Sequence, residues 1–147
     1  MRYFVAVFCC ALLSTAILVS MPASPAQAYP TYGYDDSSGQ AVVDEARSWM
    51  GTPYGAYGLD CSGFTSMVYA RFGVYLPDNP AVQYSYGVPS TAKAGDLVFF
   101  DEHGYGISHV GIATGYGTVI HSSTYYGAVV ESPLWEVPGY VGARDVL

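Results

Sequence analysis

One cysteine and two histidines are the residues of this chain best suited to covalent chemistry. Cys61 follows Asp60 at the start of a predicted helix. Unpaired backbone N–H groups and the positive end of the helix dipole favour a thiolate there, which is the reactive form of cysteine. The negative charge of Asp60 acts against the thiolate. Position alone therefore leaves two interpretations open, a nucleophile or an inert buried thiol.

The two histidines can supply what a nucleophilic cysteine needs, which is an imidazole acting as base and acid and a polar group that orients it. His109 and His121 lie on consecutive predicted strands joined by residues 115–117. A three-residue loop places both histidines on one face of the sheet as diagonal neighbours, whereas a two-residue loop separates them. We expect the three-residue loop, because it keeps Ile112 opposite Ile120.

Other roles are open for these side chains. A histidine taken singly is more often a surface residue or a hydrogen-bonded core residue than a catalytic one. His103 lies in a glycine-rich loop between acids, so we expect it in solvent or at the rim of a cleft. A zinc site made of Cys61, His109 and His121 is conceivable, but the short C-x-x-C and H-x-x-x-H spacings are missing. We therefore expect no metal and no cofactor.

Three helices are predicted in the first half of the chain, covering residues 40–50, 60–72 and 80–86. Apolar side chains recur at helical spacing in the first, and Gly51 follows its end. Asp60 is expected to cap the second helix and Asn79 the third, which starts at Pro80. The buried stripe of the second helix should consist of Phe64, Met67, Val68 and Phe72.

From Asp96 onward, short apolar runs alternate with Gly, Pro and Asp, which is typical of strands. The connections are too short for crossover helices, so the strands must pair antiparallel. Gly111 and Ala113 should leave room beside His109 for a helix or for substrate. The fold class is thus α+β, with N-terminal helices packed on a small antiparallel β-sheet. The predicted strands cover residues 96–100, 109–113, 118–123, 128–132 and 140–147.

The N-terminal residues 1–28 are predicted to be a secretory signal peptide. Arg2 precedes a long apolar run, and residues 26–28 form an A-x-A cleavage signal. The alternative is an uncleaved membrane anchor, because the apolar run is long. Residues 29–39 are expected to form a flexible leader, followed by one domain at 40–147. We expect a secreted or cell-envelope protein with no stable membrane association after cleavage.

Composition excludes several classes of function. The net charge is -7, from 5 Lys plus Arg and 12 Asp plus Glu, which argues against nucleic-acid and anionic-lipid binding. The 51% hydrophobic content argues against disorder, and the many Gly and Tyr argue against a coiled coil. Signal cleavage would remove Cys9 and Cys10, leaving Cys61 as the only thiol and no intramolecular disulfide.

Seven motifs taken together resemble those of the NlpC family. The members of this family are papain-like cysteine peptidases of bacterial cell walls. They run in order from about Gln40 to Leu147, and the D-C-S-G-F and S-H-V-G-I blocks joined by G-D-L-V-F-F are specific as a set. The motifs are Gly51-Thr52-Pro53-Tyr54, Asp60-Cys61-Ser62-Gly63-Phe64, Leu76-Pro77, Gln83, Gly95-Asp96-Leu97-Val98-Phe99-Phe100, Ser108-His109-Val110-Gly111-Ile112 and His121-Ser122.

The resemblance implies a papain-like fold and an endopeptidase that cuts peptidoglycan stem peptides between D-γ-glutamate and the diamino acid. We expect it to be a monomer. It implies Cys61 as nucleophile, His109 as general base and acid, and His121 as the residue that orients His109. An amidase or acyl transferase of the same fold is an alternative, and so is a catalytically silent wall-binding module.

The resemblance also implies a substrate-binding set that recognises the free amino end of the stem peptide, consisting of Tyr54, Asp60 and Ser62. An acidic side chain facing a substrate ammonium is physically reasonable. The Cys61 backbone N–H would be one oxyanion donor. Two features depart from the family pattern. The loop from Tyr54 to Asp60 is short, and Ala94 replaces the usual proline before Gly-Asp-Leu.

Overall fold

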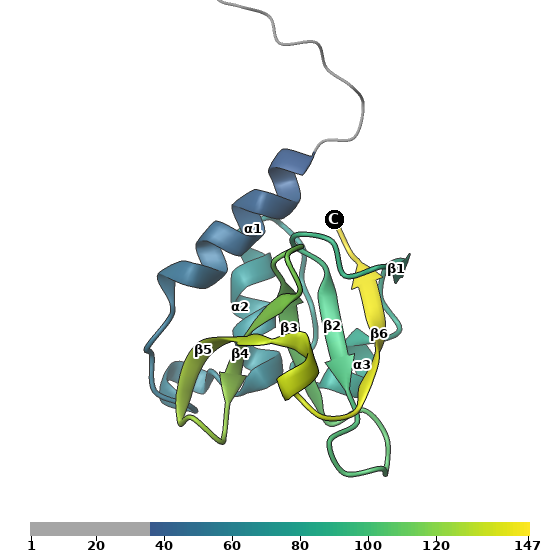
Figure 1. The fold of residues 1–147 in the computed structure, drawn as a ribbon. Coiled ribbons are helices and arrows are strands. Elements are labelled where there is room, and N and C mark those ends of the chain that lie inside the picture. The colour runs from purple at the N-terminus through teal and green to yellow at the C-terminus, as the bar shows by residue number, and fades with distance from the viewer. Residues whose placement is uncertain (1–35) are drawn as a thin grey trace, which may run out of the picture. The chain divides into compact units, whose positions relative to one another are not determined.

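Two helices cover one face of an antiparallel sheet in the computed structural model, which describes residues 36–147 (Figure 1). This arrangement confirms the predicted α+β fold class. The predicted signal peptide and most of the predicted leader lie outside the described residues. No helix within residues 36–147 combines the length and the apolar character needed to span a membrane.

Helix α1 (Asp36–Ser48) starts earlier than the predicted Gln40, so it includes the last residues assigned to the leader. Gly39 lies within this extension, where it is packed closely. A side chain at this position would collide with the backbone oxygen of Ala94, and Gly95 packs against the Gly39 Cα atom. The absence of a side chain lets the first turn of the helix lie directly on the turn at residues 94–95, which leads into the strand Leu97–Phe100.

The predicted caps of the next two helices are confirmed. The Asp60 carboxylate accepts from the Gly63 N–H at 2.7 Å at the start of α2 (Cys61–Ala70). Asn79 accepts from the Val82 N–H at 3.0 Å at the start of α3 (Pro80–Gln83). Helix α3 ends before the predicted Tyr86, because the chain tightens there into turns. A short 3₁₀ helix, η1 (Ala56–Gly58), precedes α2.

The sheet has six strands in the order β1-β6-β2-β3-β4-β5, and every neighbouring pair is antiparallel. β1 was not predicted, because it is short, exposed and contains Pro89, which is tolerated in an edge strand. A second 3₁₀ helix, η2 (Leu134–Glu136), precedes the last strand. The strands are β1 (Val88–Ser90), β2 (Leu97–Phe100), β3 (His109–Ala113), β4 (Thr118–Ser123), β5 (Ala128–Pro133) and β6 (Tyr140–Asp145).

The core lies mainly between α1, α2 and one face of the sheet. Phe64 and Val68 are fully buried as predicted, and Met67 is partly buried. Phe72 was expected in the buried stripe but is 36% exposed, because α2 ends at Ala70 and Phe72 lies in the following turn. Tyr69 takes its place in the core, and its hydroxyl donates to the Gly95 carbonyl.

The hairpin of β3 and β4 has the register expected for a three-residue loop. Ile112 lies opposite Ile120, and the Thr114 N–H donates to the Thr118 carbonyl at 3.1 Å. One expectation about this hairpin is wrong. The space above Gly111 does not admit a helix or substrate, because the side chains of Val119 and His121 fill it.

Candidate active site

The Cys61 side chain lies against the first residues of β3. Its sulfur is 3.9 Å from the Ser108 carbonyl oxygen, and the Val110 N–H points toward it, so the thiol contacts the backbone on both sides of His109. The preceding loop is fixed to the sheet, because the Ser122 hydroxyl donates to the Leu59 carbonyl at 2.6 Å. The side chain is buried, with 9% of its surface exposed.

The thiol of the free protein is protonated at neutral pH. Burial is the main cause that raises the pKa of Cys61 to about 11, and the charges of Asp60 and Glu102 add to it. The N–H groups of Val110 and Ser62 lower this pKa but do not compensate. The N–H groups thus favour the thiolate and Asp60 opposes it, as the sequence predicts, but burial and two carboxylates outweigh the N–H groups.

The two histidines are in direct contact, as their predicted common face requires. His109 Nε2 lies 2.7 Å from His121 Nδ1, and the ring planes are nearly perpendicular at 85°. Both rings are buried. Burial lowers the pKa of His109 to about 3, with a contribution from His121, and lowers the pKa of His121 to about 4. Both rings are neutral at pH 7.

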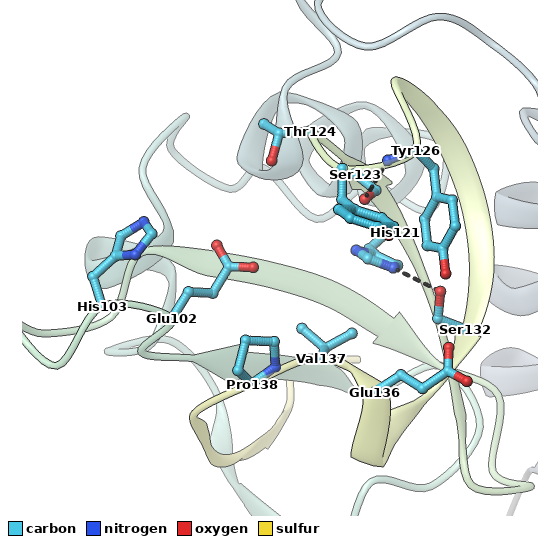
Figure 2. A pocket seen from close by; sticks show the side chains of 11 residues that line it. Glu102, His103, His121, Ser123, Thr124, Tyr126, Ser132, Glu136, Val137 and Pro138 are labelled. Atoms are coloured by element: carbon cyan, nitrogen blue, oxygen red, sulfur yellow. Dashed lines mark hydrogen bonds between the residues drawn. The ribbon is translucent and has the colours of Figure 1, made fainter.

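A third side chain continues this hydrogen-bonded line. His121 Nε2 lies 3.2 Å from Ser132 Oγ, so the line crosses three adjacent strands from β3 to β5. His121 and Ser132 also line a cavity of about 500 Å³. Figure 2 shows their contact as a dashed line, with Glu102 and His103 on the other side of the cavity. His103 is exposed at the cavity, in agreement with its predicted place at a rim.

The three predicted substrate-binding residues differ in accessibility. Tyr54 is 38% exposed, and the charges of Cys61 and Asp60 contribute to its raised pKa after burial, so the three groups lie near one another. Asp60 is partly buried. Ser62 is buried, and its hydroxyl donates to Asp78 at 2.8 Å and lies 3.3 Å from the Asp60 carboxylate.

Sequence reasoning missed three side chains of this region. Asp78 receives the Ser62 hydrogen bond, Glu102 acts on the thiol through its charge, and Ser132 contacts His121. The register of β4 with β5 places Val130 opposite His121 and thus Ser132 diagonally from it, so the hairpin pattern contained a signal for Ser132. Within residues 36–147, no three His, Cys, Asp or Glu side chains are placed to hold a metal ion.

The described α+β domain carries the Cys61 thiol at a helix start. The thiol lies beside the strand that carries His109, whose ring contacts His121. This combination defines the papain-like class. The chain belongs to the NlpC/P60 family, whose sequence profile matches residues 44–138. A solved structure, the NlpC/p60 domain of the peptidoglycan hydrolase SagA, is 38% identical with a TM-score of 0.63, covering 73% of this chain and 97% of that chain.

Two curated relatives are also similar. A probable endopeptidase of Corynebacterium glutamicum (strain R) is 39% identical over 137 residues, covering 88% of this chain and 62% of that protein. A gamma-D-glutamyl-L-lysine dipeptidyl-peptidase of Bacillus cereus is 33% identical over 132 residues, covering 80% of this chain and 38% of that protein. The chain therefore spans less than two thirds of the length of these curated relatives.

Proposed function

We propose that this chain is a secreted, monomeric cysteine endopeptidase that hydrolyses peptidoglycan stem peptides at the bond between D-γ-glutamate and the diamino acid. The observation that carries the proposal is the Cys61 sulfur lying against the residues that flank His109, which is joined to His121. The names of relatives as a probable endopeptidase, a gamma-D-glutamyl-L-lysine dipeptidyl-peptidase and a peptidoglycan hydrolase support the substrate class.

Catalysis starts from a neutral pair, because the thiol is protonated and His109 is neutral at pH 7. As substrate binds, the Cys61 sulfur attacks the carbonyl carbon of the scissile amide and its proton moves to His109. The carbonyl π electrons move onto oxygen, where the Cys61 backbone N–H stabilises the developing negative charge. His109 is then an imidazolium that donates one hydrogen bond to His121.

The tetrahedral intermediate collapses when the C–N bond breaks and His109 gives its proton to the leaving amine of the diamino acid. The acyl group remains on Cys61 as a thioester. His109, neutral again, takes a proton from water as the water oxygen attacks the thioester carbonyl carbon. The second tetrahedral intermediate collapses when the C–S bond breaks and His109 returns its proton to the sulfur, which releases the carboxylic acid and the Cys61 thiol. Each cycle consumes one water and returns the free enzyme.

The substrate ammonium has a place beside the thiol. Tyr54, Asp60 and Ser62 form the binding set for the free amino end of the stem, with the Asp60 carboxylate as the charged acceptor. A cation bound there offsets one of the charges that raise the pKa of Cys61. Substrate binding thus brings the thiol pKa closer to that of the base that must take its proton.

Replacement of the sulfur tests the proposal. Cys61→Ala and His109→Ala should each lower stem-peptide hydrolysis by about a thousandfold or more. Cys61→Ala loses the covalent attack, and His109→Ala loses the proton transfer. Tyr75→Ala changes an exposed side chain that follows the end of α2 opposite to Cys61, and it serves as the control. Undiminished cleavage by Cys61→Ala would refute the nucleophile assignment.

Two alternatives make different predictions. An amidase or acyl transferase would use the same thioester but cut or form another bond, so mass spectrometry of muropeptide products distinguishes it from the endopeptidase. A silent wall-binding module is favoured by one observation, the raised pKa of Cys61, which an inert thiol would also show. That alternative predicts binding of stem peptides with no product from the wild-type protein.

A further inference from the structure

The line from His109 through His121 to Ser132 constrains where hydrogen atoms can lie. A distance of 2.7 Å between His109 Nε2 and His121 Nδ1 requires one hydrogen between the two nitrogens. In one arrangement His109 is the donor, and its Nδ1 lone pair is free to accept the thiol proton. In the other arrangement His121 is the donor, the hydrogen of His109 lies on Nδ1, and His109 cannot act as a base.

The two arrangements require opposite hydrogen-bonding roles of the Ser132 hydroxyl, which accepts in one and donates in the other. When His109 donates to His121 Nδ1, the neutral ring of His121 carries its hydrogen on Nε2, which must donate to Ser132 Oγ. When His121 donates to His109, its Nε2 is a lone pair that accepts the hydroxyl hydrogen of Ser132. Only the first arrangement is compatible with a protonated His109, since an imidazolium donates from both nitrogens.

We propose that Ser132 is a positioning residue of the active site, accepting the His121 Nε2 hydrogen and thereby holding both rings in the tautomers that leave His109 Nδ1 free for the thiol proton. This inference rests on the proposed function of Cys61 and His109. Ser132 touches neither the reacting sulfur nor the substrate carbonyl, and it acts through His121.

The surroundings of Ser132 suit this role. The side chain is buried, but it lines the cavity of about 500 Å³, so its own hydroxyl hydrogen can point to water there while the oxygen accepts from His121. Besides His121, the titratable groups that line this cavity are Glu102, His103, Tyr125, Tyr126 and Glu136, and none of these five is hydrogen-bonded to Ser132. Strand pairing fixes the position, because Ser132 lies opposite Val119 in the β4–β5 ladder.

Three variants separate positioning from a merely structural role. Ser132→Ala removes the acceptor, and kcat should fall about tenfold with KM nearly unchanged, the lower end of what outer hydrogen-bond partners contribute in other sites. Ser132→Thr keeps the hydroxyl on a residue suited to strands and should restore most of the rate. Ser123→Ala is the matched control, because Ser123 is also buried beside the cavity but accepts from the Tyr126 N–H.

Nuclear magnetic resonance of ¹⁵N-labelled imidazoles reads the tautomers directly, and the chain has only 3 histidines to assign. In the wild type, His109 and His121 should both carry their hydrogen on Nε2. In Ser132→Ala, His121 should show a mixture of the two tautomers. An unchanged His103 signal checks that the spectral change is local.

The outcomes are decisive in both directions. A His121 hydrogen on Nδ1 in the wild type overturns the inference, and so does a Ser132→Ala variant with wild-type kcat or with lowered kcat and unchanged tautomers. A wild-type protein that cleaves no stem peptide would reject the proposed function, whereas the tautomer measurement would still decide whether Ser132 orders the two rings.

Discussion

The two faces of the central sheet are built on different principles. The face toward α1 and α2 packs Ile112 and Ile120 of the sheet against Phe64 and Val68 of α2, and all four belong to one apolar cluster and are fully buried. The opposite face has a smaller apolar cluster around Val98, Phe100, Ala113 and Val119, together with the two histidines. One face is covered mainly by hydrocarbon, and the other buries two imidazole rings in contact with each other.

This difference implies a division between stability and chemistry. Burial of apolar surface on the helix face drives folding, at roughly 25 cal/mol per Å². The histidine face gains little from burying rings, because polar groups must first lose their water. That loss nevertheless keeps both rings neutral, which a general base requires. Changes on the first face should therefore act on unfolding, and changes on the second should act on pH dependence and rate.

The largest expected effect is on the helix face. Phe64→Ala removes a fully buried ring and should lower the free energy of unfolding by about 3–5 kcal/mol. Phe72→Ala is the matched control, because Phe72 lies just beyond the end of α2. Its effect on the free energy of unfolding should be far smaller, since Phe72 is partly exposed. Urea unfolding of both variants measures this. Equal losses would mean that the apolar cluster is not the main source of stability.

The histidine face predicts a loss of stability in acid. Above the ordinary histidine pKa of 6.5 the rings are neutral in the folded and the unfolded chain, so they add no pH dependence. Below pH 6.5 the two histidines are protonated in the unfolded chain but stay neutral in the folded chain, until the pH reaches the folded pKa values of about 3 and 4. Stability should fall from pH 6.5 to 5 by on the order of 2 kcal/mol per histidine.

Histidine variants isolate this contribution from the other titrating groups. The double variant His109→Gln with His121→Gln should lose less stability than the wild type between pH 7 and pH 5. His103→Gln, which changes an exposed histidine, should keep the wild-type dependence. If the double variant shows the same decrease as the wild type in urea unfolding, the two rings are not buried in the neutral form.

A smaller effect is expected where the histidine face is packed most closely. Gly111→Ala introduces a methyl group against the side chains of Val119 and His121, so it should cost about 1–3 kcal/mol of stability and displace the His121 ring. Gly142→Ala is the control in β6, because a side chain there meets only the Tyr84 hydroxyl at ordinary contact distance. Calorimetry and hydrolysis rates measure both. A tolerated Gly111→Ala would show that the hairpin can open beside His121.

Local patterns in the sequence predicted much of this architecture. The helix caps at Asp60 and Asn79 each depend on a few neighbouring residues, and the Ile112–Ile120 pairing depends on the length of one short loop. These features depend on interactions close in sequence, which pattern and propensity describe well.

Features that depend on distant segments were not predictable in this way. β1 is three residues long and exists only because β6 pairs with it. The contact of His121 with Ser132 needs the register of a second hairpin. The raised pKa of Cys61 depends on burial by the whole fold and on the charge of Glu102, which comes from another loop.

The smallest expected effect concerns the Cys61 thiol, which belongs to the apolar cluster on the helix face and contacts the backbone beside His109. Asp60→Asn removes one of the charges that raise the pKa of Cys61, and asparagine caps helices as well as aspartate does. The thiolate fraction at pH 8 should therefore increase, and iodoacetamide should alkylate Cys61 about threefold faster than in the wild type. Asp44→Asn removes a charge on α1 that is not among those raising the pKa of Cys61, so it should leave the rate unchanged.

The same substitution should act in the opposite direction on catalysis. Asp60→Asn loses the carboxylate proposed to bind the substrate ammonium, so KM for stem peptides should rise although the free thiol is more reactive. A variant with faster alkylation and weaker substrate binding would separate the two roles of Asp60. Unchanged alkylation would mean that the charge of Asp60 does not contribute to the raised pKa of the Cys61 thiol, which would leave burial as its main cause.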